Sequence, residues 1–224
     1  VNEAWVAWKP RSRDVKREKA VFYAEIFQLY VPSAGVIEGA HYAAIRPAQG
    51  ELSELSFDVP KGATVTDVLG TGPKSEIRNP KSDQSLVTSA PTGSVVSLWR
   101  FDPDTRKLRV SLNPPQSRPF ALLLRSQVAT GPLPFEQSVG LVSADAAASQ
   151  IGLFGVATGN EVQLDTVSAE TFSSINLEDF HGFVAQTLQA QIPGLTVRRA
   201  FRYADPKAVA TLKARRQTPT SSRP

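Results

Sequence analysis

Residues 95–112, VVSLWRFDPDTRKLRVSL, decide the fold class. Apolar and polar side chains alternate on both sides of a turn that contains Asp102, Pro103 and Asp104, and this arrangement predicts a β-hairpin with strands over 95–101 and 107–112. Asp102 and Asp104 have the D-x-D spacing of some calcium ligands. The glycine and the distal glutamate of a calcium loop are absent from the sequence, so we interpret both aspartates as turn residues.

Similar short runs follow one another in both directions from this hairpin. Residues 21–31 (VFYAEIFQLYV) mix aromatic and β-branched side chains, and 52–59 alternate with one phase slip that indicates a β-bulge. Gly152 and Gly155 indicate a bulge or a close backbone approach within their strand. Further strands are expected at 36–45, 64–69, 120–128, 138–142, 151–157, 161–167, 200–203 and 208–214. These runs predict a mainly β fold, an antiparallel β-sandwich followed by a smaller β-rich subdomain with one helix.

The expected helix covers 177–192 and ends at Pro193 and Gly194, which stop helices. Its apolar side chains recur at three- and four-residue spacing: Phe180, Phe183, Val184, Leu188 and Ile192.

The rigid connector Gly131-Pro132-Leu133-Pro134 marks a domain boundary. We expect a basic N-terminal segment over 1–19, a β-sandwich domain over 20–130, a smaller β-rich domain with one helix over 131–214 and a disordered tail over 215–224. Residues 70–94 hold almost no apolar side chain and are too long for a compact connection. This stretch is either a mobile insertion or a binding loop, and we favour the insertion.

The net charge of +4 is unevenly distributed. Residues 1–19 hold six basic and three acidic side chains, residues 195–224 hold eight and one, and the body between them holds eleven and seventeen. The basic ends indicate either contact with an anionic surface or solvated flanks that pair with the acidic body. Aromatic side chains do not interleave with the basic ones, so no specific nucleic acid is expected. The candidate contact residues are Arg11, Arg13, Lys16, Arg17, Arg215 and Arg216, and the same basic flanks hold Lys9, Lys19, Arg198, Arg199 and Arg202.

Motifs for catalysis and metal binding are missing from the sequence. Without cysteine, the chain has no disulfide, no thiolate nucleophile and no sulfur-based zinc site. His41 and His181 are its two histidines, and a zinc site on them would need Glu178 or Asp179 as a further ligand. We interpret both as structural or surface histidines. A G-x-S-x-G elbow is absent, and residues 70–75 (GTGPKS) lack the spacing of a phosphate-binding loop. No catalytic residue, cofactor or metal is therefore expected.

Two kinds of side chain leave other functions open. Paired carboxylates act in glycosidases, and Glu51 with Glu54 or Glu178 with Asp179 are such neighbours in the sequence, although a glycosidase pair is defined by its separation across a cleft. Trp99 lies in an expected strand, where an aromatic side chain either stacks on sugar rings or fills the core, and we favour the core interpretation.

The chain starts at Val1 and contains no Met. This indicates that a leader was removed or that the chain is a fragment of a longer protein, and the polar stretch 217–224 (QTPTSSRP) favours a fragment. Trp5 and Trp8 would then pack on the parent protein or insert at a membrane interface.

Three segments, 45–69 (IRPAQGELSELSFDVPKGATVTDVL), 95–112 and 120–135 (FALLLRSQVATGPLPF), resemble β-rich extracytoplasmic modules of uncharacterised bacterial membrane-anchored proteins. In these modules a strand, a P-x-G turn, a W-containing strand and an L-x-V-x-L strand follow one another. The rhythm is also similar to the N-terminal β-saddle of zinc aminopeptidases, but H-E-x-x-H is absent here, so no peptidase activity is implied. The resemblance covers roughly residues 20–205 and implies a cell-envelope location, periplasmic or extracellular, and a non-catalytic role.

We therefore expect a non-catalytic module of a larger cell-envelope protein that acts in assembly or in ligand or partner binding. Its partners would be other domains of the parent chain or other proteins. One alternative is a carbohydrate-active enzyme that uses paired carboxylates, and another is a basic-tailed module that docks on an anionic surface.

Overall fold

The computed structural model describes residues 19–71, 95–180, 182–189 and 192–217. Most of these residues lie in strands, and α1 (Gly182–Gln189) is the single α-helix among them. The prediction of a mainly β fold with one helix is therefore confirmed. Trp5, Trp8, His181 and most of the 70–94 stretch lie outside the described residues.

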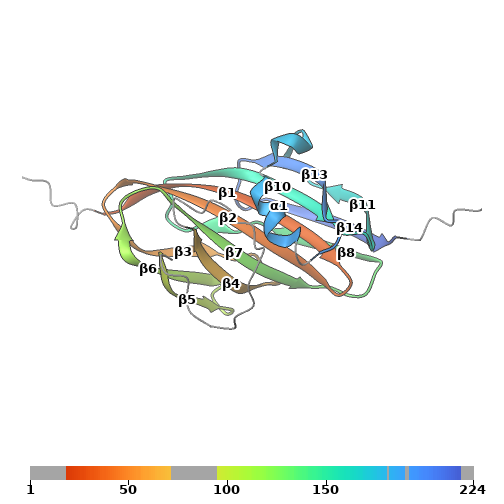
Figure 1. Ribbon diagram of the computed structural model, residues 1–224, viewed down its shortest axis with the longest axis horizontal. Coiled ribbons are helices and arrows are strands. Elements are labelled where there is room, and N and C mark those ends of the chain that lie inside the picture. Colours follow the sequence, from red (N-terminus) through yellow and green to blue (C-terminus); the bar gives the residue numbers. More distant parts are fainter. Residues whose placement is uncertain (1–18, 72–94, 181, 190–191, 218–224) are drawn as a thin grey trace, which may run out of the picture.

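A seven-stranded sheet runs the length of the molecule (Figure 1). Its centre is the long hairpin of β1 (Val21–Ser33) and β2 (Val36–Gln49), which turns at Gly35 with a φ of 84°. Neighbouring strands are antiparallel except β1 and β10, which run parallel. The complete order is β12 (Ser173–Ser174), β13 (Thr196–Tyr203), β10 (Ser149–Thr158), β1, β2, β7 (Phe120–Ala129) and β4 (Ala63–Thr71).

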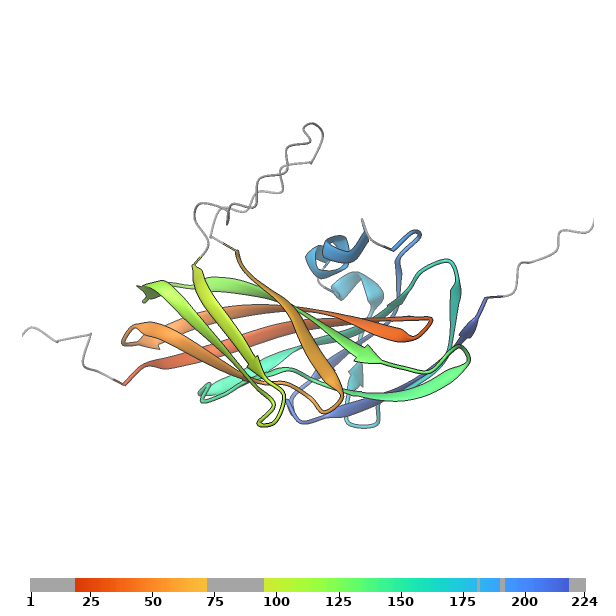
Figure 2. The same cartoon turned by 90° about the horizontal axis from the view of Figure 1, so that it is seen from below.

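Two smaller sheets form the second layer (Figure 2). One contains β11 (Val162–Ser168), β14 (Val209–Arg216) and β8 (Phe135–Gly140) in that order. The other contains β5 (Val96–Asp102), β6 (Lys107–Gln116), β3 (Leu52–Asp58) and β9 (Ser143–Ala144). Alternate side chains of the strands in both layers meet in one buried core, whose members include Ile26, Phe57, Leu108, Leu122, Phe154 and Leu212.

The other face of the long sheet carries the helical segment. The expected helix over 177–192 is a 3-10 turn, η2 (Leu177–Asp179), followed by α1. Val184 and Leu188 of α1 pack with Leu29 of β1 in a second, smaller apolar cluster. The Arg125 side chain of β7 donates a hydrogen bond from Nη2 to the Thr187 carbonyl oxygen at 3.0 Å, which holds the last turn of the helix to the sheet.

The expected boundary at residue 131 falls between strands that belong to the same sheet. β1 pairs with β10 over eight residue pairs, from Tyr23 opposite Ser149 to Tyr30 opposite Val156. Val139 of β8 also lies in the same core as Phe57 of β3. The segments 20–130 and 131–214 therefore share one sheet and one apolar core.

Several local predictions are confirmed. The register of β3 against β6 shifts between Leu52 and Glu54, which is the expected bulge. A Cβ on Gly152 would collide with the carbonyl oxygen of Ile26, so this glycine permits a close backbone approach. In the β5–β6 turn, Asp102 accepts a hydrogen bond from the backbone N–H of Asp104 at 3.0 Å. Hydrogen bonds from the Thr105 side chain and the turn backbone lower the pKa of Asp102.

Candidate functional site

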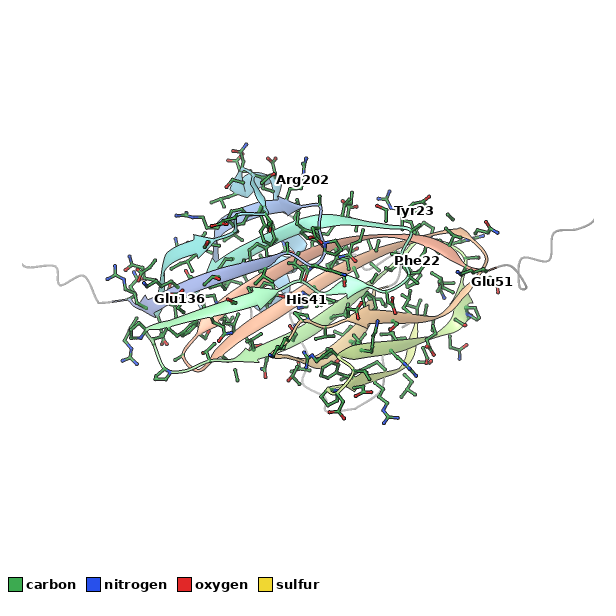
Figure 3. All side chains as sticks on the ribbon, turned by 180° about the vertical axis from the view of Figure 1, so that it is seen from behind. Phe22, Tyr23, His41, Glu51, Glu136 and Arg202 are labelled. Carbon is green, nitrogen blue, oxygen red and sulfur yellow. The ribbon has the colours of Figure 1, made fainter. Side chains whose placement is uncertain are left out.

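His41 lies in the middle of the core and is fully buried (Figure 3). Its Nδ1 is 3.0 Å from Oε1 of Gln28, and its Nε2 is 2.8 Å from Oγ of Ser126. Oε1 of Gln28 also accepts the Val142 backbone N–H at 2.8 Å, so Nδ1 of His41 carries the proton and Nε2 accepts from the Ser126 hydroxyl. Burial lowers the pKa of His41 to about 3. The ring is a neutral, hydrogen-bonded part of the core.

The two pairs of neighbouring carboxylates considered in the sequence lie on different elements. Glu51 precedes β3 and Glu54 lies within it, whereas Glu178 and Asp179 are exposed on the 3-10 turn. Neither pair lines the pockets described below. Within the ranges that the structure describes, no group of three or more His, Asp or Glu side chains is placed to hold a metal ion. Trp99 is half-buried and packs against the core.

The candidate anion contacts separate into different environments. Nε of Arg215 lies 2.7 Å from Oδ1 of Asp165, so this arginine is already paired. Arg216 lines a pocket at the same end of the molecule. Arg202 is exposed at the rim of the long sheet (Figure 3). Arg11, Arg13, Lys16 and Arg17 lie outside the described residues.

A β-bulge in β13 brings two further arginines together. Arg199 lies opposite Val156 of β10 and Val197 lies opposite Ala157, so Arg198 is the extra residue without a partner on β10. A bulge changes the direction of side chains relative to a regular strand. Arg198 and Arg199 consequently line the same pocket of about 350 Å³, between β13 and β11, which we call the arginine pocket. Its other lining residues are Thr158, Val162, Gln163, Leu164 and Gln217.

Both guanidinium groups in the arginine pocket are held by one hydrogen bond each. Nε of Arg198 donates to Oγ1 of Thr158 at 3.0 Å, and Thr158 is only 1% exposed. Nη1 of Arg199 donates to the Arg198 carbonyl oxygen at 3.0 Å. A guanidinium has five N–H donors, so most of them remain available. In the described part of the chain neither arginine forms an ion pair. The pocket can therefore bind an oxyanion through two oriented, unneutralised cations.

A second pocket of about 370 Å³ adjoins the arginine pocket. Val162 lines both pockets, and the second one lies on the other side of the turn between β10 and β11. Leu133 and Ile192 give it apolar walls, and Glu161 and Arg216 add one charge of each sign. The two pockets together form a hollowed region at the end of the molecule where β14 finishes.

The sequence placed Arg198 and Arg199 in a basic flank but did not identify the pocket. One signal was present: consecutive residues of a regular strand face opposite sides, so one of two adjacent arginines in a buried strand would enter the core. An Arg-Arg pair within such a strand therefore indicates a bulge or an open sheet end. The pocket itself depends on β11, which is distant from β13 in the sequence.

No protein-family model and no curated protein matches the chain. Among solved structures, the chain is similar to a mutant M1 zinc metallopeptidase of Deinococcus radiodurans with a bound Tyr-Ser-Ala substrate, at 11% sequence identity and a TM-score of 0.40. The match covers 86% of this chain and 42% of that one, so this chain spans less than half of that protein's length. None of the helices in the described ranges is long and apolar enough to cross a membrane.

Proposed function

We propose that this chain is a non-catalytic binding module of a larger cell-envelope protein and that it binds an anionic group of a partner in the arginine pocket. The observation that carries the binding role is the bulge in β13, which directs Arg198 and Arg199 into one pocket. The resemblance of the strand and turn order over 45–135 supports the envelope location.

The arginine pocket favours anion binding for an electrostatic reason. Two cationic side chains on adjacent residues repel each other, and an oxyanion placed between them replaces this repulsion by two attractions. The hydrogen bond to the buried Thr158 holds the Arg198 guanidinium in place before a ligand arrives, which lowers the entropy lost on binding. Arg215 offers less, because Asp165 already neutralises it.

Anion binding is tested by thermal unfolding with increasing citrate or inorganic phosphate at constant ionic strength. A ligand that binds only the folded chain raises the unfolding temperature. Arg202 is exposed on the other face of β13, so Arg202→Gln is the matched control. We expect the unfolding temperature to rise for the unmodified chain and for Arg202→Gln, but not for the double variant R198Q/R199Q. Equal stabilisation of the double variant and of the unmodified chain would refute the site.

The same variants separate a pocket from a diffuse basic surface. Vesicles that contain phosphatidylglycerol serve as the probe for docking on an anionic surface. If vesicle binding falls with Arg202→Gln as much as with R198Q/R199Q, the overall basic charge is responsible and the pocket is not. Fractionation of cells that make the full-length protein tests the envelope location, and recovery in the cytosolic fraction alone would contradict it.

A further inference from the structure

The arginine pocket lies along the backbone edge of a strand. Val162, Gln163 and Leu164 are consecutive in β11, and all three line it. Successive side chains of a strand point to opposite faces of the sheet, so a pocket beside one face alone would contact only every second residue. A pocket that contacts all three must run beside the backbone itself.

The backbone groups that face this pocket follow from the strand register. The Gln217 N–H donates to the Glu161 carbonyl oxygen at 2.9 Å, so these two residues form a hydrogen-bonded pair. Hydrogen-bonded and non-hydrogen-bonded pairs alternate in an antiparallel ladder. Gln163 is therefore bonded to Arg215 of β14, whereas Val162 and Leu164 turn their N–H and C=O groups away from β14.

The outer edge of β11 has no strand beside it among the described residues, since β11 pairs only with β14. The opposite wall is also open: β12 pairs with Phe201 and Arg202 of β13 and does not reach Arg198 or Arg199. The space between β11 and β13 thus combines free backbone donors and acceptors on one wall with two cations on the other.

We propose that the arginine pocket receives an extended acidic segment of a partner polypeptide, which adds to the edge of β11. This inference rests on the proposed function and names the partner. Backbone hydrogen bonds to Val162 and Leu164 would hold the segment, and every second side chain would point toward β13, where a carboxylate meets Arg198 and Arg199. A small anion or a lipid phosphate uses only the arginines, whereas a polypeptide uses both walls.

The test compares two fluorescein-labelled peptides of alternating Glu and Thr, or Gln and Thr, by fluorescence anisotropy. We expect the Glu peptide to bind at least tenfold more tightly than the Gln peptide, and we expect R198Q/R199Q to abolish that difference. The matched pair Leu164→Pro and Leu164→Ala examines the edge, because both lose the leucine side chain but only proline loses the outward N–H. Leu164→Pro should bind the Glu peptide about tenfold more weakly than Leu164→Ala, with equal response to citrate.

A measurement on the unmodified chain covers the case in which Leu164→Pro does not fold. Two Glu peptides carry N-methyl groups on every second amide, in the two alternative phases, and we expect only one phase to lose binding by tenfold or more. If both phases bind as the unmethylated peptide does, the edge proposal is overturned while the anion pocket stands. If citrate also binds R198Q/R199Q normally, the proposed function falls as well.

Discussion

Burial of His41 predicts a loss of stability on mild acidification. In the unfolded chain this histidine has its ordinary pKa of 6.5, and in the folded chain the pKa is lowered to about 3 by burial. Between these values the unfolded state binds a proton that the folded state does not, so stability is full above pH 6.5 and falls as the pH drops. From pH 7 to pH 5 this one group removes about 2 kcal/mol from the free energy of unfolding.

Among the described residues, the ionisable side chains next to His41 and its hydrogen-bond network are Tyr30 and Tyr203. The Tyr30 ring packs edge-on against the His41 ring, with 5.4 Å between the ring centroids. The Tyr203 hydroxyl accepts a hydrogen bond from Gln28, which in turn is bonded to His41. Desolvation by burial raises the pKa of both tyrosines, so both stay neutral.

Chemical denaturation at pH 7 and pH 5 measures this effect. His41→Asn keeps a donor near the position of Nδ1 but has no group that titrates. Carboxylates contribute equally to both proteins, so the comparison isolates one ring. We expect the pH-dependent loss to be smaller by about 2 kcal/mol in His41→Asn than in the unmodified chain. The same pH dependence in His41→Asn and the unmodified chain would refute a buried neutral His41.

Five further substitutions test individual contacts of the fold. Gly152→Ala places a methyl group against the backbone of β1 and should destabilise the fold by about 3 kcal/mol or more in thermal melts. A Cβ on Gly182 meets no atom within 4 Å, so Gly182→Ala should be neutral or stabilising by up to about 1 kcal/mol in the same melts. Lys107→Ala removes surface ion pairs to Asp58 at 2.8 Å and to Asp145 at 2.9 Å and should lower the free energy of unfolding by less than about 1 kcal/mol. Leu108 is the next residue and lies in the core, so Leu108→Ala should lower it by about 2–5 kcal/mol in a urea titration. Tyr203→Phe removes a hydroxyl that donates to the Ile26 carbonyl oxygen of β1 at 2.9 Å. We expect the free energy of unfolding at equilibrium to fall by about 1–3 kcal/mol, and a change outside this range would contradict that role.

The strands were predictable from the sequence because each depends on local alternation and turn chemistry. The 95–112 hairpin depends only on residues between Val95 and Leu112. In the same way, the phase slip near Leu52 marks the bulge of β3 directly. Gly152, which permits the close approach of β1 and β10, was also identified in the sequence as a glycine inside an expected strand.

The pairing of β1 with β10 was not predictable in the same way. A period of two shows which side chains share a face but does not select a partner more than 100 residues away, and the short strands with tight turns predict antiparallel neighbours. The interpretation of His41 as structural needed no partner, but its hydrogen bonds to Gln28 and Ser126 depend on three strands brought together by folding. The arginine pocket has the same origin, since β11 and β13 belong to different sheets.

Amide hydrogen exchange, followed by NMR with and without the alternating Glu-Thr peptide, tests the binding site most directly. In the free chain, the Val162 and Leu164 amides face the open edge and should exchange quickly, whereas the Gln163 amide is bonded to β14 and should exchange slowly. We expect the acidic peptide to slow amide exchange at Val162 and Leu164 and to leave exchange at Gln163 unchanged. Unaltered exchange at both outward amides under saturating peptide would contradict it.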